Sequence, residues 1–202
     1  MITGRLIQHF YLIIRPVCGG VYDKRHLVPF GEYVPFRSWV PFLDIIAGPA
    51  DFVAGEHNHL MAVPGIGQVQ TLICYEVIFA GQVIAPTDRP DVMVNITNDA
   101  WFGTTIGPWQ HLYQSQLRAV EEGIPLVRVA NTGISAAFDG FGRQLGTIPL
   151  GTRAYLDIAL PSVLTAPVFA RFGNAGFFAL CFGVFGVAWV LYKRERQQAY
   201  TA

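Results

Sequence analysis

Apolar residues in the middle of the chain come in short runs that are separated by polar turns. Runs of four to eight residues rich in Val, Ile, Leu and Phe are typical of strands. The runs that predict strands are residues 69–74, 91–96, 126–130, 135–138 and 154–160. A turn at residues 139–142 leads into one further strand. Strands that first alternate with a helix and then continue as hairpins predict a mixed α/β fold.

Residues 109–122 have the spacing of an amphipathic helix. Tyr113, Leu117 and Val120 recur at helical intervals, which predicts that they form the apolar side of this helix. Gly123 ends the helical pattern. His111 on the same helix is expected to be structural rather than catalytic.

The C-terminal part of the chain is apolar over a longer distance. Residues 175–192 contain no charged side chain, and at about 1.5 Å per residue they are long enough to cross a bilayer. We expect a transmembrane helix at 172–192 and a tail at 193–202. Lys193, Arg194 and Arg196 place that tail in the cytoplasm by the positive-inside rule. A buried core helix is the alternative, but the glycines of this segment disfavour a helix in water.

Composition and cysteine spacing exclude several classes of function. The formal net charge is zero and charged residues are only 14%, so nothing indicates nucleic-acid binding. The three cysteines are odd in number, far apart and never in C-x-x-C spacing, so neither a disulfide framework nor a metal site is indicated. Cys181 lies in the apolar C-terminal segment and is expected to be a small buried hydrophobe.

The first 50 residues give a weaker pattern. Residues 1–20 contain an apolar stretch too short to span a bilayer. Residues 27–50 are rich in proline and aromatic residues, which predicts an ordered loop with a short helix near 39–46. Its aromatic side chains fit either a membrane interface or the core under a long loop.

Cys74 is the position with the most chemical interest, because an apolar run ends there on a thiol. By position alone a packing role is the simpler interpretation, but strand ends of α/β folds are also where active sites collect. Glu76 follows and is expected to accept backbone N–H groups. Lys24 lies in a polar stretch, where a lysine is usually solvated. Glu32, however, is the only charged residue from Leu27 to Phe36, so we expect Lys24 to be drawn into a pocket and to pair with it. A thiol, an amine and carboxylates suit covalent acyl transfer.

Four motifs occur in one order along the chain. They are Tyr22-x-Lys24-x-His26-Leu-Val-Pro-Phe-Gly-Glu32-Tyr-Val-Pro, Cys74-Tyr75-Glu76, Asn98-Asp-Ala-Trp101-Phe102-Gly103 and Gly107-Pro-Trp-Gln-His111. From about Val21 to the C-terminus the chain resembles the apolipoprotein N-acyltransferase family, a membrane-bound branch of the nitrilase, or carbon–nitrogen hydrolase, superfamily. Several long motifs in order are far more specific than one short pattern. Residues 1–20 carry none of this resemblance.

The resemblance implies a fold and a site. The fold is a nitrilase-like α-β-β-α sandwich, incomplete at its N-terminus and spanning residues 21–168, with one C-terminal transmembrane helix. Cys74 matches the nucleophile, Lys24 the catalytic lysine and Glu32 a supporting glutamate. Tyr75 and Glu76 match the residues beside the nucleophile. Trp101 and Phe102 are expected either to line the pocket or to form a turn. A turn is also expected at Asn131, Thr132 and Gly133. No metal or organic cofactor is implied.

The implied function is transfer of a phospholipid acyl chain, through a cysteine thioester, to the N-terminal amine of a diacylglyceryl-modified apolipoprotein. The expected location is the bacterial inner membrane, with the catalytic domain on the periplasmic side. The family's general-base glutamate should precede Lys24, yet residues 1–23 contain no Glu. The chain therefore resembles a fragment, for which weak or no activity is expected. The alternatives are a soluble nitrilase-type amidase and a non-catalytic membrane-anchored remnant.

Overall fold

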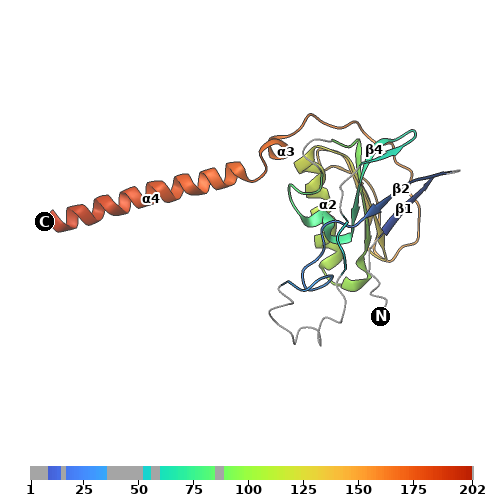
Figure 1. The fold of residues 1–202 in the computed structure, drawn as a ribbon, viewed down its shortest axis with the longest axis horizontal. Helices are drawn as coiled ribbons and strands as arrows, with labels where there is room; N and C mark the ends of the chain where they lie inside the picture. Colours follow the sequence, from blue (N-terminus) through green and yellow to red (C-terminus); the bar gives the residue numbers. More distant parts are fainter. Residues whose placement is uncertain (1–8, 15–16, 36–51, 56–59, 85–88, 202) are drawn as a thin grey trace.

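The structure is a computed structural model that describes residues 9–14, 17–35, 52–55, 60–84 and 89–201. It consists of an α/β domain and a long C-terminal helix that extends away from it (Figure 1). The expected short helix at 39–46 lies outside the described residues.

One six-stranded sheet forms the centre of the domain. Its strands follow one another in chain order, so that each strand pairs with the next one. The pairs β4–β5 and β5–β6 are parallel, and the other three pairs are antiparallel. The strands are β3 (Met61–Val63), β4 (Gly67–Ile73), β5 (Val92–Asn98), β6 (Leu126–Asn131), β7 (Ser135–Phe138) and β8 (Gln144–Ile148). A mixed α/β sheet is therefore confirmed.

The connections between the parallel strands carry the helices of the domain. The 3-10 helix η2 (Cys74–Ile78) follows β4 directly. The 3-10 helix η3 (Asp99–Phe102) follows β5, and α2 (Gly107–Glu122) then returns the chain to β6. Because parallel strands end at the same edge of a sheet, Cys74 and Asp99 come to one edge.

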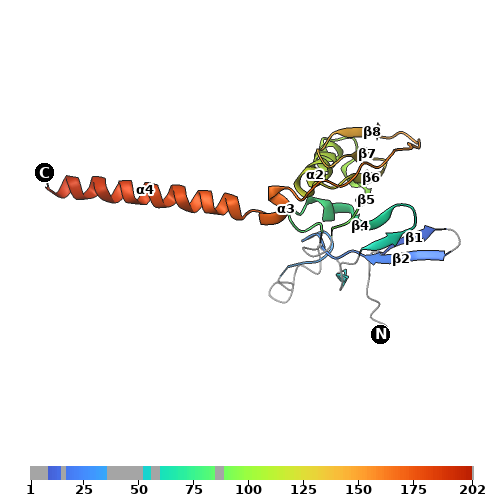
Figure 2. The same cartoon turned by 90° about the horizontal axis from the view of Figure 1, so that it is seen from above.

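An antiparallel hairpin precedes the sheet in the chain. It is formed by β1 (His9–Ile14) and β2 (Val17–Asp23), and β2 contacts β3. In Figure 2 the hairpin lies beside the β4 end of the sheet, while α2 lies over β5 to β7. The end of β2 thus delivers Lys24 to the part of the domain where β4 ends.

The main core lies between the sheet and α2. It contains Leu72, Met93, Leu126 and Phe138 from four strands, and Leu112, Ala119 and Ile124 from α2 and the turn after it. A smaller cluster of Val63, Val69 and Val92 forms on β3, β4 and β5.

The side of α2 that faces the sheet differs from the prediction. Tyr113, Leu117 and Val120 are 59%, 48% and 42% exposed, so the expected apolar stripe faces outward. The buried side carries Leu112 and Ala119 together with polar residues, among them His111, Ser115 and Arg118. The prediction was wrong because the sheet presents a buried arginine to this helix, and polar side chains of α2 bind it.

No strand forms at residues 154–160. Tyr155 and Leu156 line a hollow together with Val127 and Val129 of β6. This segment therefore crosses the face of the sheet, whereas a strand would have to pair along its edge.

The C-terminal segment forms two helices, α3 (Val168–Phe172) and α4 (Ala175–Thr201). Gly173 has φ +52° and ends α3, so Phe172 does not belong to the long helix, and α4 continues beyond Tyr192 into the expected tail. Within α4, residues Ala175–Arg194 are long and apolar enough to cross a membrane.

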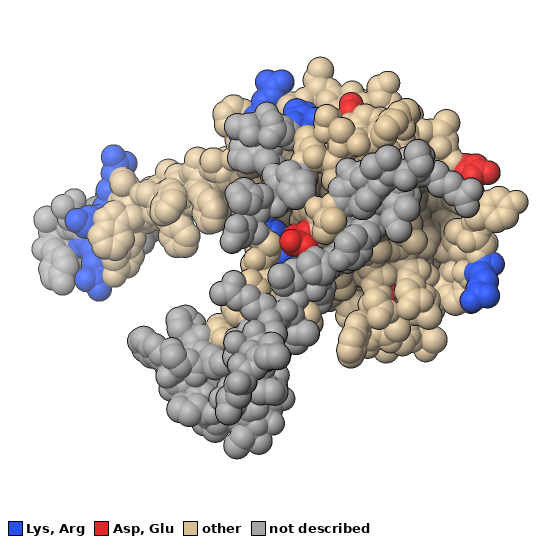
Figure 3. Space-filling view, turned by 45° about the vertical axis from the view of Figure 1, so that its right-hand side comes forward, with Lys and Arg blue, Asp and Glu red and all other residues tan. Residues whose placement is uncertain are grey.

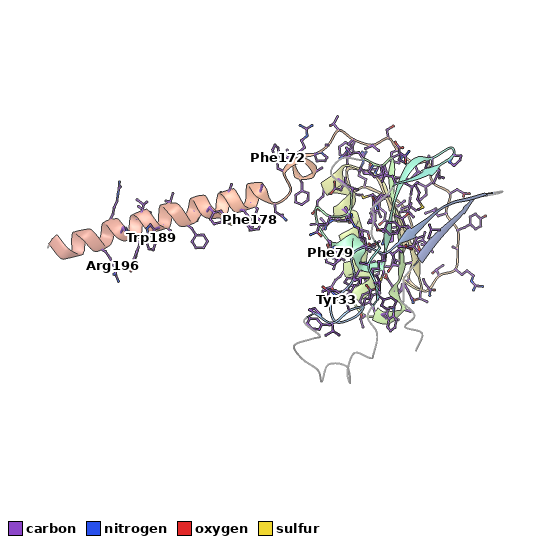
Figure 4. All side chains as sticks on the ribbon, in the orientation of Figure 1. Tyr33, Phe79, Phe172, Phe178, Trp189 and Arg196 are labelled. Carbon is purple, nitrogen blue, oxygen red and sulfur yellow. The ribbon has the colours of Figure 1, made fainter. Side chains whose placement is uncertain are left out.

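The apolar side chains of α4 do not pack on the domain. None of the candidate span is buried, and Phe178 and Trp189 project into open space in Figure 4. Cys181 is partly exposed there, and not buried in a core as expected. Lysine and arginine gather at the far end of the helix (Figure 3), where Lys193 lies 5.5 Å from the Trp189 ring.

Candidate active site

Cys74 lies at the junction of β4 and η2 in an unusual backbone conformation. Its φ of +54° is in the left-handed region, which costs a residue with a side chain about 1–2 kcal/mol. Such conformations persist only where the surroundings impose them, and they are concentrated at functional sites. The thiol is partly exposed and forms no disulfide. The chain therefore presents this thiol on a sharp turn at the end of a strand.

Asn95 on the neighbouring strand β5 binds the backbone of this turn. Its Nδ2 atom donates to the carbonyl oxygens of Leu72 and Cys74, both at 3.1 Å. Its Oδ1 atom accepts from Nη1 of Arg128 at 2.6 Å. The backbone of Cys74 is thus connected through one amide to a buried guanidinium on β6.

Glu76 joins the Cys74 turn to the segment that carries Lys24. Its carboxylate accepts from the backbone N–H groups of Arg25 at 2.8 Å, His26 at 3.0 Å and Ile73 at 2.7 Å. The hydroxyl of Tyr22 donates to it at 3.0 Å. Glu76 is only 4% exposed, and the expectation that it accepts backbone N–H groups is confirmed. Burial and the Glu76 charge raise the pKa of Tyr22, which therefore stays a donor.

Lys24 and Glu32 form the expected buried ion pair. Nζ of Lys24 lies 2.5 Å from Oε1 of Glu32, and the lysine side chain is fully buried. The second carboxylate oxygen of Glu32 accepts from the N–H of Val28 at 2.8 Å. Because Glu76 binds the backbone of the residue after Lys24, this segment lies at the end of β4 that carries the thiol.

A second buried cluster surrounds Arg128, which is 1% exposed. Its guanidinium donates to Asp99 at 2.5 Å, to Ser115 at 3.2 Å and to the carbonyl of Ile134 at 3.3 Å, besides Asn95. Asp99 also accepts from the hydroxyl of Thr97 at 3.1 Å. Sequence reasoning missed Arg128 and Asn95 as site residues. A charged residue inside the apolar run 126–130 is the signal that could have revealed a buried partner.

Asp99 is ionised despite its burial. Burial raises its pKa, but the hydrogen bond with His111 and the charge of Arg128 outweigh burial, so the net pKa lies below the usual value. Gly133 approaches the carboxylate so closely that a Cβ atom there would lie 2.5 Å from Oδ2. The predicted turn at Asn131–Gly133 thus also leaves room for this ion pair.

Aromatic rings cover the side of the cluster that faces away from β6. The ring of Tyr75 lies 4.8 Å from that of His111 and 5.9 Å from that of Phe102. All three residues line a pocket of about 650 Å³. Trp101 is 86% exposed and does not line it, so of the two predicted pocket aromatics only Phe102 is in place.

Comparison with known proteins identifies the family of this chain. Residues 6–168 match the model of the family described as carbon-nitrogen hydrolase. The chain belongs to the carbon–nitrogen hydrolase family. This membership confirms the predicted fold class. The match begins at residue 6 and includes β1 and β2, so the expectation that residues 1–20 carry none of the resemblance was wrong for residues 6–20.

Curated members of this family that resemble the chain are named apolipoprotein N-acyltransferase. The protein of Bradyrhizobium diazoefficiens is 45% identical over 157 residues, which cover 76% of this chain and 29% of the relative. That of Rhizobium rhizogenes is 39% identical over 178 residues, covering 85% and 33%. That of Rickettsia prowazekii is 43% identical over 154 residues, covering 76% and 31%. The chain thus spans about a third of the length of these relatives.

Solved structures were also matched. A carbon-nitrogen hydrolase from Helicobacter pylori G27 has a TM-score of 0.46 and 13% identity, over 66% of this chain and 49% of that one. An amidase from Nesterenkonia sp. has a TM-score of 0.44 and 24% identity, over 66% and 47%.

Replacing Glu76 tests its connecting role in this carbon–nitrogen hydrolase domain. Glu76→Ala leaves three backbone N–H groups without their acceptor, and we expect it to lower the free energy of unfolding by about 3 kcal/mol. Glu76→Gln keeps one acceptor oxygen and should lose less. Urea unfolding in detergent measures both, with the exposed Asp157→Ala as control. If Glu76→Ala lowered the free energy of unfolding no more than Asp157→Ala does, the connecting role of Glu76 would be contradicted.

The low pKa of Asp99 predicts how its contribution to stability depends on pH. A carboxylate with a depressed folded-state pKa stabilises the fold above its unfolded pKa of about 3.9, and this contribution is lost as the pH falls through the folded value. Asp99→Asn should therefore be destabilised at pH 7, and its deficit against wild type should shrink below about pH 4. Urea unfolding at pH 7 and in the acid range measures the difference. A deficit that does not change with pH would contradict the prediction.

Proposed function

We propose that the protein to which this chain belongs transfers an acyl chain from a phospholipid to the N-terminal amine of a diacylglyceryl-modified lipoprotein, through a thioester on Cys74. The observation that carries the proposal is the left-handed turn at Cys74, joined through Glu76 to the segment of the buried Lys24–Glu32 pair. The names of the curated relatives support the same reaction.

In the first half of this reaction, the Cys74 thiol gives its proton to a base and its sulfur attacks the ester carbonyl. A C–S bond forms, the C–O bond breaks, and the lysophospholipid oxygen takes up a proton. Lys24 and the backbone N–H groups after Cys74 stabilise the oxyanion that forms on the way. The ion pair with Glu32 offsets part of the cost of burying the Lys24 side chain.

In the second half, the amine nitrogen of the lipoprotein attacks the thioester. A C–N bond forms and the C–S bond breaks, and the proton that the amine loses passes through the base to the leaving thiolate, which restores the thiol. A thiolate serves both halves because it is a good nucleophile and a good leaving group. The resemblance assigns the role of base to a glutamate upstream of Lys24.

Mass spectrometry of acylated protein tests the nucleophile. We expect the full chain in detergent to form an acyl adduct on Cys74 with p-nitrophenyl palmitate, whose leaving group needs no proton, and a slower adduct with phosphatidylglycerol. Cys74→Ser should abolish both, and Cys181 in the same molecule reports non-specific acylation. Equal labelling of Cys74 and Cys181, or no adduct from either donor, would refute the assignment.

We further propose that α4 crosses the bacterial inner membrane with its C-terminus in the cytoplasm. The uncovered span Ala175–Arg194 and the basic residues Lys193 and Arg194 at its end support this orientation. The active site would then lie on the periplasmic side, at the depth of lipid esters.

A reporter fused after Ala202 measures this orientation. Alkaline phosphatase, which is active only outside the cytoplasm, should be inactive there, and a fluorescent protein that folds in the cytoplasm should be bright. Val184→Arg, in the middle of the span, should weaken insertion by about 2.5–3.5 kcal/mol, while Arg196→Lys should have no effect. An active phosphatase would reverse the orientation.

A further inference from the structure

His111 carries a buried polar atom that the described part of the chain leaves without a partner. The residue is 3% exposed, and its Nε2 atom is buried and forms no hydrogen bond within the described residues. Buried polar atoms in folded proteins are nearly always hydrogen-bonded, so an orphan of this kind indicates a missing partner. The ring is held firmly between Tyr75 and Phe102.

The other ring nitrogen fixes what that partner must be. Nδ1 of His111 lies 2.9 Å from Oδ1 of Asp99 and 3.1 Å from Nη2 of Arg128. A carboxylate can only accept, and it is the nearer of the two, so Nδ1 carries the hydrogen and donates it to Asp99. In that tautomer Nε2 carries no hydrogen and can only accept a hydrogen bond. Its partner must bring an N–H or O–H donor.

Among the described residues, no charged side chain lines the pocket to which His111 contributes. Tyr75 and Phe102 provide aromatic surface, and Thr105, Gln110 and Gln114 provide neutral polar groups. The volume of about 650 Å³ is that of a site for a small ligand. Amide side chains and a lone-pair acceptor suit a peptide, which presents N–H and C=O groups together. A phosphate group would enter without any counter-charge, and a lipid ester has no donor for Nε2.

We propose that this pocket binds the peptide segment that follows the acceptor amine, with a backbone N–H of that peptide donating to Nε2 of His111. The inference rests on the proposed function, which requires a lipid donor and a peptide acceptor at one nucleophile. Tyr75 connects the two places, because it lines the pocket and directly follows Cys74. The peptide therefore enters from the α2 side of the site.

Nitrogen NMR of the full chain in detergent, labelled with ¹⁵N-histidine, tests the contact itself. The probe is an S-diacylglyceryl-cysteinyl peptide with three further neutral residues and a C-terminal amide. The comparison ligands are diacylglyceryl-cysteine methyl ester, which lacks the peptide, and phosphatidylglycerol. We expect only the peptide probe to move the Nε2 resonance of His111 upfield, as hydrogen-bond donation to a lone pair does. An unchanged resonance, or an equal shift with either comparison ligand, would overturn the proposal.

Variants test the site by a second route. His111→Asn keeps an N–H donor toward Asp99 but lacks Nε2, and Gln114→Trp fills the pocket while leaving His111 in place. Each should weaken probe binding in equilibrium dialysis by about two- to tenfold, the value of one neutral hydrogen bond. Trp109→Phe, a half-exposed position of α2 outside the pocket, should bind as wild type does. Wild-type affinity for Gln114→Trp would contradict a peptide in this pocket.

The two levels of the proposal fail differently. An absent Cys74 adduct together with a peptide-dependent His111 shift would refute acyl transfer and leave the peptide site standing. A Cys74 adduct without any His111 shift would retain acyl transfer and refute the peptide site.

Discussion

The arrangement of the site depends on the hydrogen bonds that the Glu76 carboxylate accepts. This carboxylate accepts from the ends of two separate segments, the turn that begins at Ile73 and the stretch that contains Arg25 and His26. One buried charge, satisfied by three backbone N–H groups and a tyrosine hydroxyl, therefore joins the segment that follows Lys24 to the turn that carries the thiol. Further contacts hold the same segment beside η2, since the His26 ring stacks on Phe79 at 3.4 Å and Arg25 donates to the carbonyl oxygen of Gln82.

A second constraint acts from the opposite side of the turn. Asn95 holds the carbonyl of Cys74, and Arg128 holds Asn95. Burying a guanidinium is costly unless every donor is used, which explains why α2 and η3 turn Ser115 and Asp99 toward it. The left-handed conformation at Cys74 is thus imposed by the sheet beneath it. A core of this kind gives up apolar packing in exchange for a fixed backbone at Cys74.

Much of this arrangement could be predicted from particular residues. The thiol at a strand end, the paired Lys24 and Glu32, and the acceptor role of Glu76 each follow from a polar group in an apolar stretch, whose burial demands a partner. The inward side of α2 could not be predicted, because hydrophobic periodicity assumes an apolar partner and the actual partner is Arg128. The prediction of a strand at 154–160 was wrong for a similar reason. Strand propensity does not show whether a segment will meet the edge or the face of the sheet.

The reactivity of Cys74 toward iodoacetamide, with and without the Glu76 contact, tests the central claim most directly. In the wild-type chain in detergent at pH 7, Cys74 should be alkylated faster than Cys181, because the proposed mechanism requires a reactive thiol at the end of β4. In a folded Glu76→Gln variant the rate at Cys74 should fall toward that of Cys181. Equal rates at Cys74 in the two proteins would show that the reactivity of the thiol does not depend on the Glu76 contact.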